Sequence, residues 1–396
     1  MQTSWLSAVI LGLLVSGTQF APAQTGALAP TPPMGWSTWN HFHHDISDAL
    51  VRKQADALVA SGMRDAGYVY VHIDGGWQGY RDSAGVLHPN SSFPDMKALG
   101  DYIHSKGLKF GMYSGPGPQS CAGAPASYGF EAQDAKMFAS WGVDYLKYDL
   151  CSFRILMKQE SGGDVAKSDA MMKAAYQKMH EALAATGRPI LFSLCQYGWG
   201  EVWEWGAQVG GSMWRTSGDI SDTYDSMSLN GFGEAGLAAF AGPGHWNDPD
   251  FLEVGNSGMT ADEQRTHMSL WAILAAPLIA GNDLTAMSDT TKSILLNKEV
   301  IAVDQDPLGR EGDRASKTGP LEVWSKPLAG DAMAVALFNR TTDATHITLR
   351  LKEVGWQGSA AARDLWSHQD LGVLSGEKVF TVPAHGVVLL RLSRSR

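Results

Sequence analysis

The sequence is poor in cysteine, in charge and in long apolar runs, and each shortage excludes a class of protein. Three cysteines in 396 residues are too few for a disulfide-rich scaffold. Lys and Arg number 31 against 41 Asp and Glu, and the resulting net charge of −10 disfavours nucleic acid or an anionic membrane as a partner. No segment has about 18 uninterrupted apolar residues, so we expect no membrane span. The hydrophobic content of 44% indicates a folded globular protein.

The N-terminus has the pattern of a secretory signal peptide. A largely apolar stretch from Leu6 to Val15 precedes Ala21-Pro22-Ala23, a small-x-small cleavage pattern, although the usual basic residues are missing. We therefore predict that residues 1–23 are removed on export to the periplasm or the medium. An oxidising space allows one disulfide and leaves one thiol among Cys121, Cys151 and Cys195.

Strand-like and helix-like segments alternate over residues 24–308. The apolar spacing predicts helices at 47–66, 96–106, 128–141, 169–186, 199–210, 226–240 and 262–273, and strands between them. No hairpin signal separates these units, so about eight of them predict parallel strands closed into a (β/α)8 barrel. An open doubly wound sheet is the alternative, but its early glycine-rich phosphate turn is missing.

Residues 309–396 have a different character, without a helical period. Turn residues separate short alternating runs at 321–325, 332–338, 346–351, 362–366 and 387–392. This pattern predicts a small antiparallel β-sandwich domain that packs on the barrel and braces it.

The segment Asp144–Ser152, DYLKYDLCS, carries the main candidate site residues. On a strand, Tyr145, Lys147 and Asp149 share one face. We expect the Lys147 ammonium to favour the ionised form of Asp149, which is the state that a carboxylate nucleophile needs. Working residues of a parallel barrel lie where its strands end. The other strand ends add aromatic, amide and charged side chains: Trp39, Asp74, Tyr113, Gln196, Arg215, Asp219 and Asp250.

Two carboxylates across a cleft, flanked by aromatic and hydroxyl-binding groups, are what glycoside hydrolysis requires. Asp149 is the natural nucleophile of a retaining mechanism, with Asp219 as its acid/base and Arg215 as a substrate ligand. A Ser-His-Asp site is disfavoured because the sequence has no nucleophile elbow. We assign no metal to the neighbouring histidines His41, His43 and His44.

Several motifs in the same order resemble glycoside hydrolase family 27. They include MGWSTWN, YVHIDGGW, GVDYLKYDLC, WRTSGDISDTYDSM, AGPGHWNDPDFLEVGNSGMT and LNKEVIAVDQDPLG. That family contains α-galactosidases, α-N-acetylgalactosaminidases, β-L-arabinopyranosidases and isomalto-dextranases. The resemblance runs from about Thr31 to the C-terminus. It implies a (β/α)8 barrel with a C-terminal antiparallel β domain, a retaining mechanism and no cofactor.

The resemblance also assigns roles to individual residues. It makes Asp149 the nucleophile and Asp219 the acid/base. It pairs Cys121 with Cys151, a bond that would add roughly 3–4 kcal/mol of stability. Cys195 then stays reduced as a buried small hydrophobe. The terminal sugar would be held by Trp39, Asp74, Tyr113, Lys147, Arg215 and Asp250.

Three departures from the family pattern affect the choice of sugar. Gly75 stands where galactosidases commonly have a second aspartate, and losing that acceptor would weaken binding by about 1.5–3 kcal/mol. Gln196 stands where they often have Glu, near the C2 substituent, and Leu150 replaces a polar residue after the nucleophile.

The function predicted from the sequence is therefore an exo-acting, retaining α-galactosidase that acts on terminal α-D-galactosyl groups of oligosaccharides or polysaccharides. The alternative keeps the mechanism with another sugar, namely α-N-acetylgalactosaminide, β-L-arabinopyranoside or isomalto-oligosaccharide. A non-catalytic carbohydrate-binding protein is a further alternative, which the presence of both Asp149 and Asp219 disfavours. The sequence does not predict an oligomeric state.

Overall fold

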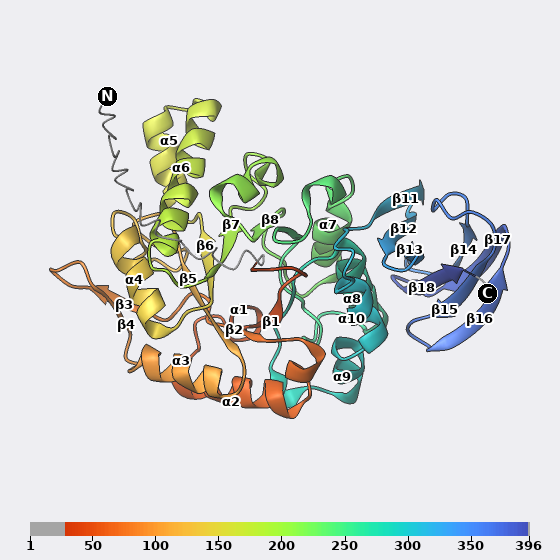
Figure 1. Cartoon of the computed structure of the whole chain (residues 1–396), viewed down its shortest axis with the longest axis horizontal. Coiled ribbons are helices and arrows are strands. Elements are labelled where there is room, and N and C mark those ends of the chain that lie inside the picture. Colours follow the sequence, from red (N-terminus) through yellow and green to blue (C-terminus); the bar gives the residue numbers. More distant parts are fainter. Residues whose placement is uncertain (1–27, 395–396) are drawn as a thin grey trace, which may run out of the picture.

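The computed structural model describes residues 28–394. The predicted signal peptide, residues 1–23, lies outside the described part of the chain. Figure 1 shows a barrel of strands with helices around it, and a second, all-β part that holds the C-terminus. Within residues 28–394, no helix is both long enough and apolar enough to cross a membrane.

Eight parallel strands form the central sheet in the order β10-β1-β2-β5-β6-β7-β8-β9. The two outer strands are joined just beyond β9, where Leu252 N donates to Ile279 O at 2.8 Å and Gly281 N donates to Leu252 O at 3.0 Å. This closure confirms the predicted (β/α)8 barrel, and the open-sheet alternative is wrong. In chain order the strands are β1 Met34–Ser37, β2 Tyr70–His72, β5 Lys109–Ser114, β6 Tyr145–Asp149, β7 Leu191–Cys195, β8 Met213–Arg215, β9 Trp246–Asp248 and β10 Leu278–Ala280.

The helices lie outside the barrel, and several begin where the sequence offers a capping side chain. Ser47 accepts from Leu50 N at the start of α2, and Thr260 and Glu263 form a reciprocal capping box at the start of α8. The α-helices are α1 Trp39–Phe42, α2 Asp48–Ala60, α3 Met96–Ser105, α4 Glu131–Trp141, α5 Phe153–Ser161, α6 Val165–Ala184, α7 Tyr224–Gly233, α8 Ala261–Leu274, α9 Asp289–Leu295 and α10 Lys298–Asp304. The 3-10 helices are η1 Arg64–Ala66, η2 Val202–Glu204, η3 Gly206–Val209, η4 Ala238–Phe240 and η5 Leu284–Ala286.

Three details of the predicted barrel are wrong. A hairpin interrupts the alternation, because β3 Gln78–Arg81 and β4 Leu87–Pro89 pair in antiparallel fashion. Its turn is made by the Asp82 carboxylate, which accepts from the backbone of Ala84 and Val86 at 2.9 Å. The helix predicted at 199–210 is two 3-10 turns, since glycines within it disfavour a continuous α-helix. Helices α1, α5, α9 and α10 were not predicted, and α5 follows β6 directly.

Alternate residues of β6 point to opposite sides of the barrel wall, as predicted for a strand. Leu146, Tyr148 and Leu150 belong to the large core between the barrel and its helices. Tyr145 points to the barrel interior, where it packs in a separate small cluster with residues of four other strands. Lys147 and Asp149 follow on that same inner face, toward the carboxyl end of the strand, as predicted.

The C-terminal domain consists of antiparallel strands only. A six-stranded sheet has the order β11-β12-β13-β18-β15-β16, and a two-stranded sheet pairs β14 with β17. The five predicted runs fall on β12–β15 and β18, whereas β11, β16 and β17 were not predicted. The bounds are β11 Asp313–Thr318, β12 Leu321–Leu328, β13 Ala332–Asn339, β14 Thr345–Arg350, β15 Ala360–Asp364, β16 Gln369–Leu374, β17 Glu377–Val382 and β18 Val387–Arg394.

This domain has its own apolar core and a second face that joins the barrel. Val335, Leu337 and Leu390 lie in the domain core. The alternate residues Ala334, Ala336 and Leu389 belong to the same cluster as the barrel helices, and α8 lies against β12, β13 and β18. The predicted boundary between residues 308 and 309 falls in the segment that connects α10 to β11.

Candidate active site

A small enclosed pocket of about 50 Å³ lies at the carboxyl ends of the barrel strands. Because all barrel strands are parallel, residues that follow different strands converge there. Every predicted catalytic and substrate-binding residue except Gln196 lines it, and of the predicted disulfide only Cys121 does. The lining residues are Trp39, Asp74, Gly75, Tyr113, Cys121, Ala122, Lys147, Asp149, Arg215, Asp219, Ile220 and Asp250.

Asp149 is a buried carboxylate at the last position of β6. The Tyr113 hydroxyl donates to its Oδ2 at 3.1 Å, and the Tyr197 hydroxyl donates to its Oδ1. Burial raises the pKa of Asp149 above its ordinary value, while the charge of Lys147 and the hydrogen bond from Tyr197 oppose the rise. The two phenols thus fix the carboxylate and stabilise its ionised form.

Lys147 makes its ion pair with Asp74 rather than with its strand neighbour Asp149, although its charge still favours the ionised form of Asp149, as expected. Lys147 Nζ donates to Asp74 Oδ2 at 2.7 Å, and His72 Nε2 lies 3.3 Å from the same oxygen. Residues two apart on a strand are about 6.6 Å apart along it, so Lys147 lies deeper in the barrel than Asp149. Burial alone would raise the pKa of Asp74, but Lys147 and His72 hold it well below its usual range.

Arg215 connects the buried floor of the pocket to its mouth. Its guanidinium lies 3.0 Å from Asp250 Oδ2 and 3.2 Å from Asp219 Oδ1. The same nitrogen donates to the carbonyl oxygens of Ser217 at 3.1 Å and Gly218 at 2.6 Å. Asp250 is buried, whereas the Asp219 side chain is 71% exposed. Arg215 therefore holds the turn that presents Asp219 to solvent above the pocket.

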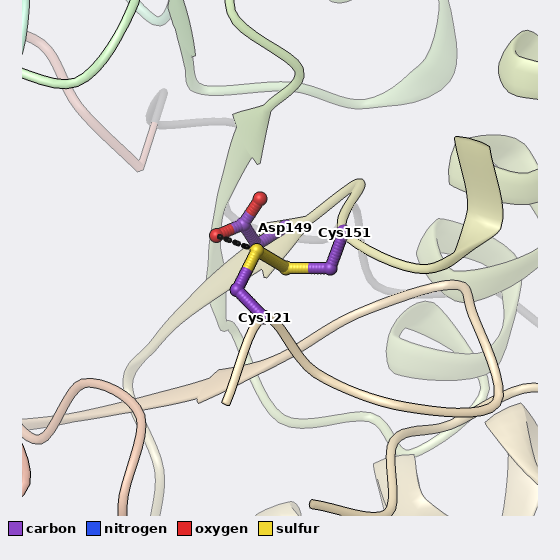
Figure 2. Close-up of side chains that lie close together, drawn as sticks. All are labelled: Cys121, Asp149 and Cys151. Atoms are coloured by element: carbon purple, nitrogen blue, oxygen red, sulfur yellow. Dashed lines mark hydrogen bonds between the residues drawn. A yellow bond between two sulfur atoms is a disulfide. The ribbon is translucent and has the colours of Figure 1, made fainter. Parts of the chain in front are cut away.

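The Cys121–Cys151 disulfide predicted from the family resemblance is present, and its Cys121 half lines the pocket. Figure 2 shows the Asp149 carboxylate beside the bond, with Oδ2 at 3.7 Å from the Cys121 sulfur. These three residues would have the spacing of a metal site, but both sulfurs are bonded to each other and offer no thiolate. Cys195 is free and buried, as predicted.

Tyr197 is the functional residue that the sequence reading missed, and Gln196 stands beside the site rather than in it. Gln196 is fully buried, and its Nε2 donates to the backbone oxygen of Arg215 at 3.1 Å. Alternate residues of β7 point to the barrel interior, and Cys195, the last residue of the strand, is one of them. If the alternation continues, the next inward residue is Tyr197 and not Gln196. That period would have selected Tyr197 over its neighbour.

The histidines near α1 do not converge on a common point that could hold an ion. His41 Nδ1 lies 3.2 Å from Asn256 Oδ1, while the rings of His43 and His44 pack edge-on against Trp39. Among the residues that the structure describes, none of the three belongs to a group of metal-ligating side chains. Trp39, which they support, lines the pocket.

The sequence and the structure both match a known family. Models of alpha galactosidase A and of the alpha galactosidase C-terminal beta sandwich domain match residues 31–306 and 318–392. The chain is 46% identical to an alpha-galactosidase of Cyamopsis tetragonoloba over 90% of this chain and 85% of that one, and 43% identical to alpha-galactosidase A of Cellvibrio japonicus over 98% and 97%. The crystal structure of alpha-galactosidase I from Mortierella vinacea matches with a TM-score of 0.86 and 37% identity, over 94% of this chain and 99% of that one. The chain therefore belongs to the alpha-galactosidase family, glycoside hydrolase family 27.

Proposed function

We propose that the protein is an exo-acting, retaining α-galactosidase that removes terminal α-D-galactosyl groups from oligosaccharides or polysaccharides. One observation carries this proposal: a buried carboxylate, Asp149, and an exposed carboxylate, Asp219, line the same small pocket. Two carboxyl groups in such a pocket are the machinery of glycoside hydrolysis. The names of the relatives support galactose as the sugar.

Asp149 is the nucleophile in this mechanism. Its free oxygen lone pair forms a bond to the anomeric carbon while the bond from that carbon to the leaving oxygen breaks, which gives a glycosyl ester. Tyr113 and Tyr197 hold one carboxylate oxygen each, so the side chain cannot rotate away from the sugar.

Asp219 is the general acid and then the general base. It gives its proton to the leaving oxygen and later takes one from the water that attacks the ester. Its exposed position at the mouth gives both the leaving group and the water access to it. Arg215 is a positioning residue for Asp219, since it binds the two carbonyls that precede it.

The remaining polar groups hold the terminal sugar. Asp74 with Lys147, and Asp250 with Arg215, present charged acceptors and donors to its hydroxyls, and Trp39 and Tyr113 offer aromatic faces. Gly75 leaves one wall of the pocket without the carboxylate that galactosidases commonly place there. For this reason β-L-arabinopyranoside, α-N-acetylgalactosaminide and isomalto-oligosaccharide are the alternative substrates.

The test compares initial rates on matched nitrophenyl glycosides and on α-galactosyl fluoride. We expect α-galactoside to exceed every other sugar at least tenfold, and Asp149→Asn to lower kcat about 10⁴-fold or more. Asp219→Asn should lose about 10³-fold on an alkyl galactoside. With the fluoride, whose departure needs no proton, the same variant should release about one equivalent of fluoride per enzyme in a burst and then turn over slowly, because the base of the second step is missing. Sugar binding without hydrolysis would overturn the proposal, and dominance of another sugar would overturn only its galactose part.

We also propose that residues 1–23 direct export and that the mature protein consists of a barrel at 24–308 and a β domain at 309–396. The disulfide supports an oxidising location. N-terminal sequencing of protein recovered from the periplasm or the medium tests this, and an intact N-terminus on cytoplasmic protein would contradict it.

A further inference from the structure

A second and much larger hollow lies directly beside the pocket. It has a volume of about 1500 Å³, against about 50 Å³ for the pocket itself. Cys121 lines both, so the two spaces meet at the disulfide. The groove continues from there between the loop Gln119–Gly123, helix α5 and the start of α6. Small-molecule pockets usually measure about 300–1,000 Å³, so this groove has the size for a longer chain.

The groove is lined by exposed apolar side chains next to the nucleophile strand. Large apolar side chains are usually buried, yet Trp199 is 47% exposed, Ile155 59% and Val165 72%. Exposed apolar side chains that gather in one groove mark a binding surface. A flat aromatic face can cover the apolar face of a sugar ring, while the edges of that ring keep their hydroxyl groups in water.

Trp199 is positioned by a contact of its ring with Arg154 and by the close packing of the backbone that follows it. The Arg154 guanidinium lies 5.7 Å from its ring centre and 5.6 Å from that of Tyr197, and Arg154 Nε donates to Cys151 O at 3.0 Å. The next residue, Gly200, has a φ of +64° and packs so close to α6 that a Cβ would lie 2.8 Å from Met172 Cε. The indole is thus a fixed platform attached to the same turn that carries Tyr197.

The charges of the groove balance each other. Arg154 and Lys158 on α5 stand against Asp164 and Asp169 at the start of α6 and within it. A groove with two cations and two carboxylates does not select a strongly charged polymer, and it offers donors and acceptors to hydroxyl groups. Its chemistry fits a neutral saccharide.

We propose that this groove binds the saccharide to which the terminal α-galactosyl group is attached, as a subsite for the leaving-group side of the substrate, with Trp199 as its stacking platform. The inference rests on the proposed function. The enclosed pocket takes the terminal sugar, and the remaining pyranose units leave through the mouth into the adjoining groove. The groove then makes the enzyme prefer branched or extended oligosaccharides over small galactosides.

The experiment compares a long and a minimal substrate on the full-length enzyme. The long substrate is a mannopentaose with one α-galactosyl branch, and the minimal one is α-galactosyl fluoride, whose leaving group is a single atom. We expect Trp199→Ala to lower kcat/KM about tenfold or more on the long substrate and less than twofold on the fluoride. Trp199→Phe should restore most of the loss. Tyr80→Ala removes an aromatic side chain that is 62% exposed on β3, away from the groove, and should change neither rate.

A second measurement needs no turnover. Unbranched mannopentaose should bind the wild-type enzyme in a calorimetric titration and bind the Trp199→Ala enzyme at least fivefold more weakly. Equal losses on both substrates, or equal binding by both proteins, would overturn the groove proposal. A wild-type enzyme that does not hydrolyse α-galactosyl fluoride would instead overturn the proposed function.

Discussion

Two regions of the molecule bury several ionisable groups, and these groups have different partners in the two regions. In the pocket, Lys147 lies 2.7 Å from Asp74 and Arg215 lies 3.0 Å from Asp250. At the contact between the barrel and the C-terminal domain, the buried groups are Asp304, Glu234, Glu311 and Lys326. Lys326 donates to backbone oxygens there, of Ala272 at 2.9 Å and of Asp304 at 3.3 Å.

The pKa values follow this difference in pairing. The pKa of Asp74 is held low by Lys147 despite burial, whereas burial raises the pKa of Glu234 to about 8 and that of Asp304 to about 7. Burial lowers the pKa of Lys326 to about 8. The Asp74 carboxylate stays ionised because a cation lies at hydrogen-bond distance, whereas Glu234 and Asp304 accept hydrogen bonds from the neutral side chains of Thr216 and Gln305, which do not offset burial. The pocket keeps its charges for catalysis, and the domain contact becomes sensitive to pH.

The largest expected effect comes from removing one partner of a paired charge in the pocket. Lys147→Met leaves the Asp74 carboxylate buried without its cation, and we expect a loss of about 3–5 kcal/mol in the free energy of unfolding at pH 7. The loss should shrink as the pH falls, because Asp74 then takes a proton. Urea denaturation measures it. Lys97→Met removes a cation from the exposed pair with Asp101 and should cost less than about 1 kcal/mol. Equal costs for the two variants would refute the comparison.

The buried acids at the domain contact predict that the wild-type protein becomes less stable as the pH rises. A carboxyl group with a raised pKa holds its proton in the folded state after the unfolded chain has lost it. Its contribution is complete below the unfolded pKa of 4.5 and disappears as the pH rises through the folded value of about 8 for Glu234. At about 1.36 kcal/mol per pH unit, Glu234 alone should lower the free energy of unfolding of the wild-type protein by roughly 3–4 kcal/mol between pH 5 and pH 8, and Asp304 should add to this loss. Thermal unfolding at a series of pH values measures the slope.

Glu311→Gln isolates that pH response. Burial raises the pKa of Glu311, and Glu234 raises it further, while its Oε2 accepts from Asn247 at 2.8 Å. The amide keeps an acceptor for Asn247 and removes the charge, so the variant should lose less stability toward pH 8. Glu322→Gln is the matched control, because the carboxylate of Glu322 is paired with Arg340 at 2.7 Å. That variant should be less stable than wild type at pH 8, and the same response from both would contradict the prediction.

A smaller effect is expected from the hydrogen bonds to the nucleophile. Tyr197→Phe removes a donor that stabilises ionised Asp149, so the pKa of Asp149 rises further. Since the nucleophile must be ionised, the acidic limb of the kcat/KM profile should move to higher pH, and kcat should fall about tenfold. A merely structural role would lower the rate without moving the limb. Tyr113→Phe removes the other donor and should move the limb in the same direction.

Periodicity and strand ends explain what the sequence could predict. The alternation of strands and helices predicted the barrel, and the carboxyl-end rule selected Asp149, Asp219 and six other residues that line the pocket. Pairing was not predictable in the same way. The sequence places Lys147 two residues from Asp149, but its partner Asp74 comes from the loop that follows β2.

Turns and irregular loops were the other source of error. Tyr197 lies on the turn that follows β7, with a φ of +60°, and it was missed because the strand period was not continued past Cys195. The β3–β4 hairpin depends on the Asp82 side chain, which accepts from the backbone of Ala84 and Val86. Helix α5 carries an apolar face and was simply missed. The groove beside the pocket is formed by the loop Gln119–Gly123 and by helix α5, neither of which was predicted, so the sequence alone did not indicate it.

The smallest expected effect tests whether the pocket can hold one more charge. At Gly75 a Cβ would lie 3.6 Å from Tyr113 Cε1 and 3.7 Å from Trp39 Cζ3, which is ordinary contact, so a side chain fits. Gly75→Asp should lower KM for an α-galactoside about fivefold, because a carboxylate would accept from a sugar hydroxyl at a net gain of about 1 kcal/mol. The added negative charge should also raise the pKa of Asp149 and move the acidic limb to higher pH. Gly75→Ala fills the same space without an acceptor and should leave KM and the limb unchanged. A gain with alanine would show that filling space matters more than charge at this wall, and no gain with aspartate would show that the sugar is already held by the paired charges on the other side.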